Sequence, residues 1–165
     1  MPTPTYDLIA SNVLGSSAAS VTFSSIPATY RDLVLVVRAT PVNNDVGLRM
    51  RLNSDTGSNY PYVTMYGDGS AAASTSATAT SITLGVGLAS PNTSATMAIA
   101  QIMDYSATDK HKTILGRTNI PTGTFPGVTA DAYRWASTSA VNAIEVYFGS
   151  GNIASGTFYL YGIVS

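Results

Sequence analysis

The chain has 165 residues, of which only 10% are charged, against roughly 25% in an average globular domain. Its formal net charge of -1 excludes the basic footprint of a dedicated nucleic-acid binder. The absence of cysteine excludes disulfides, thiol catalysis and cysteine-ligated zinc. A single histidine cannot build a multi-histidine metal site within one chain, so we expect no cofactor and no metal site.

The length predicts a single domain over residues 1–165, which begins with a short extended arm at residues 1–6. The first ten residues contain no basic segment and no long apolar run, so we expect neither a signal peptide nor a membrane helix. Prolines keep the arm extended, which suits contact with a neighbouring subunit, although a frayed terminus is the alternative. The candidate contact residues in this arm are Met1, Pro2, Pro4 and Tyr6.

The sequence pattern of the first half of the chain predicts short strands separated by turns. Residues 6–10 and 20–24 are the first two, and the second places Val21 and Phe23 on one face. The continuous apolar run at residues 33–37 is typical of a central strand that is covered on both faces. Residues 46–53 alternate strictly between apolar and charged side chains, which predicts a strand with one buried face.

The second half continues this pattern. Residues 70–81 read SAAASTSATATS, which favours a long exposed loop over a weak edge strand, and residues 120–128 predict another loop. Residues 95–105 place Met97, Ile99 and Met103 on one face. In total we expect about ten strands in an all-β, antiparallel β-sandwich or barrel. The further predicted strands are residues 60–66, 82–88, 112–118, 130–137, 143–148 and 157–164.

One segment matches a motif that is catalytic in some enzymes. Residues 55–58 read Asp-Thr-Gly-Ser, the signature of aspartic proteases, which need two carboxylates that share a proton. A single copy would therefore require a dimer. The residues before Asp55 are polar rather than apolar, and Asp-Thr-Gly is a common turn sequence. The pattern favours a turn, with the protease as a third hypothesis.

Three further positions have a chemical and a structural interpretation. His111 lies among charged residues between two strands, which favours a solvated turn over a catalytic base. Asp68 lies between two glycines, which is typical of a turn rather than of a calcium loop with several carboxylates. Tyr133 and Trp135 form a cluster suited to a subunit contact or a sugar-binding platform, with core packing as the alternative.

Several stretches resemble small structural proteins of tailed bacteriophages, including those of cyanophages and marine phages. The resemblance covers nearly the whole chain, and its motifs are strands and turns rather than catalytic groups. It implies a β-sandwich, often jelly-roll-like, that assembles symmetrically. The stretches are YDLIAS at residues 6–11, YRDLVL at 30–35, LNSDTGSNY at 52–60, YGDGS at 66–70 and FYLYGI at 158–163.

The resemblance implies a virion protein that is not an enzyme and that is assembled in the host cytoplasm. We expect a capsid cement, or decoration, protein that binds the major capsid protein and copies of itself as a homotrimer. The scarcity of charge agrees with this, because a surface with few ionisable groups suits burial against neighbours. The alternative is a tail-fibre or baseplate domain that binds a host glycan through Tyr133 and Trp135.

Overall fold

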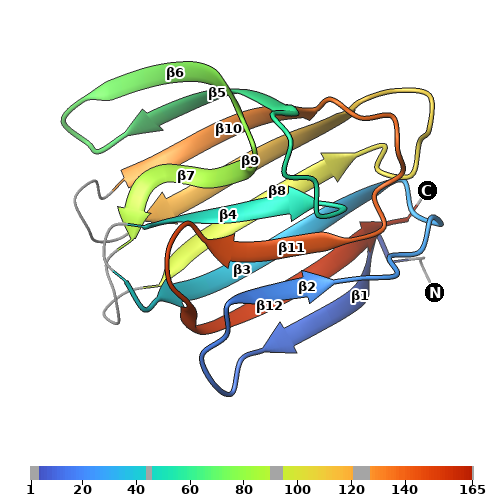
Figure 1. The fold of residues 1–165 in the computed structure, drawn as a ribbon, viewed down its shortest axis with the longest axis horizontal. Helices are drawn as coiled ribbons and strands as arrows, with labels where there is room; N and C mark the ends of the chain where they lie inside the picture. Colours follow the sequence, from blue (N-terminus) through green and yellow to red (C-terminus); the bar gives the residue numbers. More distant parts are fainter. Residues whose placement is uncertain (1–3, 44–45, 90–94, 121–126, 165) are drawn as a thin grey trace.

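The computed structural model describes residues 4–43, 46–89, 95–120 and 127–164, and the regular structure in these ranges is all β-strand (Figure 1). It confirms the antiparallel β-sandwich, with twelve strands rather than about ten. No helix in these ranges is long and apolar enough to cross a bilayer. The strands are β1 Tyr6–Val13, β2 Ser20–Phe23, β3 Asp32–Pro41, β4 Val46–Leu52, β5 Tyr60–Gly67, β6 Ala72–Ala79, β7 Ile82–Ala89, β8 Thr96–Met103, β9 Lys112–Ile120, β10 Gly127–Trp135, β11 Ile144–Phe148 and β12 Ile153–Ile163.

The two sheets differ in size. The larger has eight strands in the order β1-β12-β3-β8-β9-β10-β5-β6, and the smaller has four in the order β2-β11-β4-β7. The smaller sheet lies in front of the larger one in Figure 1, and the hydrophobic core fills the space between them. At about 4.8 Å per strand, the larger sheet is roughly 34 Å wide, so its second face is a large surface.

The continuous apolar run forms a central strand, as predicted. β3 pairs with β12 on one side and β8 on the other. Its inward residues Leu33, Leu35 and Val37 are fully buried, whereas Val34 and Val36 point to the other face and are half-buried. The strand is central, but the expectation that both of its faces are covered holds only for the inner face, because the outer face is partly exposed.

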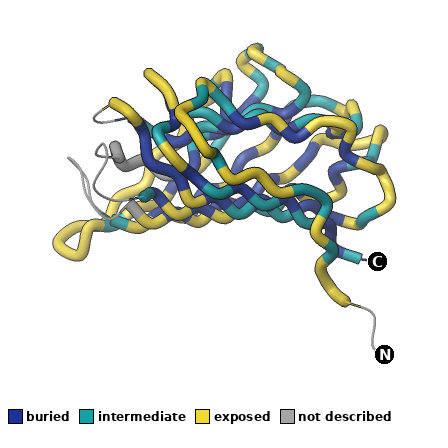
Figure 2. The backbone as a smooth tube through the Cα atoms, turned by 90° about the horizontal axis from the view of Figure 1, so that it is seen from below, coloured by how far each residue is buried: buried dark blue, intermediate teal, exposed yellow. Residues whose placement is uncertain are grey.

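The alternation in β4 is also confirmed. Leu48, Met50 and Leu52 are buried in the core, and Arg49 and Arg51 point away from it. Figure 2 shows the same alternation of buried and exposed positions along the strands of the sandwich. Period two therefore decides which residues share a face, because successive side chains point to opposite sides of a strand.

The expected N-terminal arm is shorter than residues 1–6. Tyr6 opens β1 opposite Ile163, and the amide of Val164 donates a hydrogen bond to the carbonyl of Thr5 at 3.1 Å. The chain is paired from this point because β12 offers a free edge whose backbone groups need partners. Pro4 is exposed, whereas Met1 and Pro2 lie outside the described residues.

The low-complexity segment forms a strand, so the prediction of a long loop there was wrong. β6 pairs with β5 in one unbroken register, from Tyr60 opposite Ala79 to Gly67 opposite Ala72. Residues of low β-propensity adopt this strand because the turn at residues 67–71 folds them back onto a neighbouring strand. The predicted loop at 120–128 is shorter, since β9 ends at Ile120 and β10 begins at Gly127, and residues 121–126 lie outside the described residues.

The carboxylate of Asp68 stabilises the turn between β5 and β6. Oδ1 of Asp68 accepts hydrogen bonds from the amides of Ser70 and Ala71, each at 2.8 Å, and from the hydroxyl of Ser70. Gly69 has a φ of 90°, a conformation that favours glycine. The predicted turn is confirmed, and these donors lower the pKa of Asp68 to about 2, with the amides of Ala71 and Ser70 as the largest causes.

We expect this turn to loosen in acid. Because the folded-state pKa of Asp68 is lower than its ordinary value of 3.8, its contribution is present above that value and is lost as the pH falls towards about 2. Hydrogen exchange should show faster exchange of the Ser70 and Ala71 amides as Asp68 becomes protonated, relative to intrinsic rates. Asp68→Ala, which removes the acceptor, should give fast exchange at every pH; equal protection in both proteins would contradict the assignment.

Candidate docking surface

The outer face of the larger sheet is the most unusual surface of the described chain. We call this outer face the open face, and six of its large apolar side chains, each between 45% and 62% exposed, lie near one another. They come from four adjacent strands, β8, β9, β10 and β5, so they form one patch. The six are Val63, Met65, Met97, Ile99, Leu115 and Val128.

Strand register places these side chains on one side of the sheet. Ile99 lies opposite Arg117, Arg117 opposite Ala130, and Ala130 opposite Met65. Residues that are directly opposite in neighbouring strands share a face. The positions between them point inward, where Ala98 and Ala100 are buried in the core.

The outer face of the smaller sheet is polar by comparison. Arg51 pairs with Glu145 at 3.8 Å between Nη1 and Oε2, and its guanidinium lies 4.7 Å from the ring centre of Tyr147. These side chains come from β4 and β11, which are neighbours in the sheet. The molecule therefore has one outer face with the polar composition expected against water and one with the composition of an interface.

Two depressions lie on the open face. One, of about 890 Å³, is lined by Val36, Met65, Met97, Ile99, Val128 and other residues of β3, β5, β6, β8, β9 and β10. The other, of about 510 Å³, extends towards β1 and includes Tyr6, Leu115 and Tyr161. Both are bordered by Val36, Ile99 and Arg117, so the apolar surface is continuous across the sheet.

The charges on the open face are mainly positive. Arg38, Arg117 and Arg134 are exposed there, and none of the ion pairs between described residues involves them. The acidic residue on this face, Asp32, is buried and is paired with Arg31 at 3.1 Å. An apolar surface with carboxylates would therefore be complementary to this face.

Asp55 organises a turn rather than a catalytic dyad. Its carboxylate accepts hydrogen bonds from the indole Nε1 of Trp135 at 2.7 Å, from Nδ2 of Asn59 at 2.9 Å and from the amide of Gly57 at 2.8 Å. Burial acts to raise the pKa of Asp55, but the donors Trp135, Asn59 and Gly57 together lower it. Both oxygens are occupied by neutral donors, which is the arrangement of a structural carboxylate and agrees with the predicted turn.

The aromatic cluster is part of the core, so the prediction of an exposed contact at Tyr133 and Trp135 does not hold for this chain. They are 4% and 2% exposed. The hydroxyl of Tyr133 donates to the carbonyl of Thr83 at 3.2 Å, and its ring stacks on Tyr62 with 5.0 Å between centroids. Both residues occupy inward positions of β10, between which Arg134 points to the open face.

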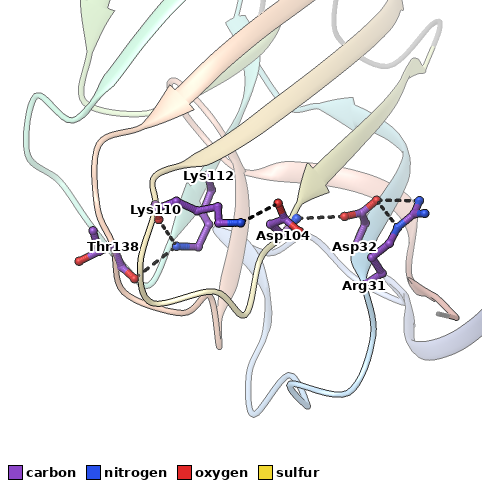
Figure 3. A network of polar contacts seen from close by, with 6 residues as sticks. All are labelled: Arg31, Asp32, Asp104, Lys110, Lys112 and Thr138. Carbon is purple, nitrogen blue, oxygen red and sulfur yellow. Dashed lines mark hydrogen bonds and ion pairs between the residues drawn. The ribbon is translucent and has the colours of Figure 1, made fainter.

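A polar network spans one end of the larger sheet (Figure 3). The amide of Asp104 donates to Asp32 at 2.9 Å, and Nζ of Lys110 lies 3.5 Å from the carboxylate of Asp104. Lys112 is fully buried, and its ammonium donates to the carbonyls of Lys110 and Thr138. Burial lowers the pKa of Lys112, against a raising effect from Asp109.

The neighbouring His111 is exposed in the loop between β8 and β9, in agreement with a solvated turn. The sequence did not indicate that Lys112, one residue later, would be buried as the first residue of β9. Among the described residues, no group of three or more His, Cys, Asp or Glu side chains could hold a metal ion.

No protein-family model and no curated protein matches this chain. Among solved structures, it is similar to a protein of unknown function from Shewanella oneidensis MR-1, with 11% identity over 99% of this chain and 78% of that chain. The TM-score of that comparison is 0.19, so it carries no conclusion about fold or function. The functional argument therefore rests on the residues of the open face.

Sequence reasoning identified the alternation that builds the open face but did not identify the face as a site. Met97, Ile99 and Met103 were correctly placed on one side of their strand. The missed signal is in the residues between them: Ala98 and Ala100 are small, as is Gly116 on the next strand. A Cβ at Gly116 would lie 3.3 Å from Cβ of Asp131 and 3.5 Å from Leu84, which shows how closely β7 approaches there.

Proposed function

We propose that this chain is a non-enzymatic structural protein of a virion, a capsid cement protein that binds the outside of an assembled shell through its open face. The observation that carries the proposal is the exposed apolar patch on the larger sheet, because contiguous apolar surface of this kind marks protein interaction sites. The resemblance of the strand and turn motifs to phage structural proteins supplies the virion context.

The proposed mechanism is stabilisation by binding. A protein that binds only the assembled shell stabilises it by its binding free energy, and copies repeated by symmetry add avidity. The partner surface, contributed by the major capsid protein, would be apolar with carboxylates that meet Arg38, Arg117 and Arg134. This mechanism does not require the homotrimer, which is untested, and the glycan-binding alternative loses its basis at Tyr133 and Trp135, which are buried.

We expect the variant Ile99→Glu to weaken binding to purified shells by at least about thirtyfold, the effect of losing one central apolar anchor. The monomer should keep its fold, because Ile99 is half exposed and Arg117 lies directly opposite to accommodate the new carboxylate. Binding is measured by co-sedimentation of the protein with shells.

A matched control is Thr83→Glu, which places a glutamate opposite Arg49 on the polar outer face of the smaller sheet. It should bind shells like the wild type. Equal binding by Ile99→Glu and wild type would remove the open face from the mechanism. Images of intact particles in which the protein is found at the tail, or is absent, would overturn the cement role itself.

A further inference from the structure

We infer that β6 is a pairing edge, at which two copies of this chain join antiparallel to form one continuous sheet of sixteen strands. β6 is the last strand of the larger sheet and is hydrogen-bonded to β5 alone (Figure 1). From Ala72 to Thr78 every residue is exposed, so the outward backbone groups of the strand face solvent. Such a row of free N–H and C=O groups is a template for another strand.

The other three sheet edges carry features that discourage pairing. β1 contains a bulge between Leu8 and Ala10, and β2 is only four residues long. The pairing of β7 with β4 is interrupted by a register shift between Val46 and Leu48. β6 has eight residues, no bulge, no proline and no charge, so it lacks each of the usual protections.

The composition of β6 fits a second copy of itself. Its residues are all alanine, serine or threonine, so two such strands meet without steric conflict and without like charges. Serine and threonine side chains that lie opposite one another can also form cross-strand hydrogen bonds. About six to eight backbone hydrogen bonds would form between two antiparallel strands of this length.

Two-fold symmetry determines the register of the two β6 strands and the side on which the two open faces lie. The axis is perpendicular to the sheet and passes beside Thr75 or Ser76, the middle residues of β6, so each lies opposite or near its own copy. Both open faces then lie on the same side of the joined sheet. Assembly stops at two copies, because each copy uses its β6 edge once. The dimer would present twice the apolar surface of a single copy to a partner.

The test is the mass of the full-length protein in solution, measured by light scattering and by sedimentation over micromolar to millimolar concentrations. We expect a reversible dimer of weak affinity, because a single strand pair is a small interface. Hydrogen exchange of the β6 amides should slow as the concentration rises. A monomer at every concentration, or a trimer, would overturn the inference.

Charge variants test the register. Ser74 and Ser76 point to the open-face side of β6, where they lie opposite Met65 and Val63 of β5. In the double variant Ser74→Lys/Ser76→Lys, lysines of the two copies meet across the axis, and the dissociation constant should rise about tenfold or more. The double variant Ser74→Glu/Ser76→Glu should raise the dissociation constant in the same way. An equimolar mixture of the lysine variant and the glutamate variant should restore the dimer.

The control Thr108→Lys/Ser139→Lys adds the same charge at exposed loop positions away from β6 and should dimerise like the wild type. A lysine variant that dimerises as well as this control would contradict pairing through β6, as would a mixture that stays monomeric. The inference does not rest on the proposed function: loss of the dimer with shell binding retained would leave the open-face mechanism intact, and the reverse result would leave β6 pairing intact.

Discussion

Raising the pH from about 10 to about 12 is expected to remove about 4 kcal/mol of folding stability through two buried tyrosines. Burial, the largest cause, raises the pKa of Tyr60 and of Tyr133 from 10 to about 12. Each shift of about two units corresponds to about 3 kcal/mol, most of which is lost between pH 10 and pH 12. The folded state holds these protons more tightly than the unfolded chain, so the contribution is complete below pH 10 and is lost as the pH rises through 12.

The local contacts explain why these hydroxyls resist ionisation. The Tyr60 hydroxyl donates to the carbonyl of Asp55 at 3.2 Å, and the Tyr133 hydroxyl donates to the carbonyl of Thr83 at the same distance. An ionised tyrosine would lose its donor while its charge stayed away from water. Burial also raises the pKa of Tyr105, which adds to the effect.

Urea unfolding at pH values between 9 and 12, with tyrosinate absorbance as a second readout, measures this loss. Tyr60→Phe should reduce the pH dependence by about half, because one of the two groups no longer titrates. Lys112 acts in the opposite direction: its lowered pKa makes stability rise with pH up to its ordinary value of 10.5. Stability that stays constant from pH 10 to 12 in the wild type would contradict the burial of these hydroxyls.

The second large effect is expected at Asp55. Asp55→Ala removes the acceptor of the Trp135 indole, together with those of Asn59 and Gly57, and should cost about 3 kcal/mol of unfolding free energy. Asp55→Asn keeps one oxygen as an acceptor and should cost about 1 kcal/mol. Because its folded-state pKa is lowered, the contribution of Asp55 is present above pH 3.8 and is lost as the pH falls below that value.

Urea unfolding followed by the fluorescence of the single tryptophan measures these losses directly at the affected residue. The control is Thr108→Ala in the exposed loop before β9, which should change the unfolding free energy by less than about 0.5 kcal/mol. If Asp55→Ala proved as stable as this control, the carboxylate would not be organising the turn.

The sequence alone determined the class of fold, because period-two alternation and frequent turns are local properties. β4 shows this: its alternation of leucine or methionine with arginine can bury only one set of side chains, whatever surrounds it. The turns at Asp55 and Asp68 were equally local, since a short carboxylate side chain bonds to backbone amides only two or three residues away.

Tertiary structure decided which face of each strand is covered. β8 presents Ala98 and Ala100 to the core and Ile99 to solvent because β7 lies close to the inner side of the larger sheet, where small residues fit. The alternation within β8 cannot determine which of its faces is buried, since both alternating sets of side chains are apolar. The same dependence on neighbours buries Trp135, whose acceptor Asp55 is 80 residues away in the chain, and makes β6 a strand, because its backbone groups pair with those of β5.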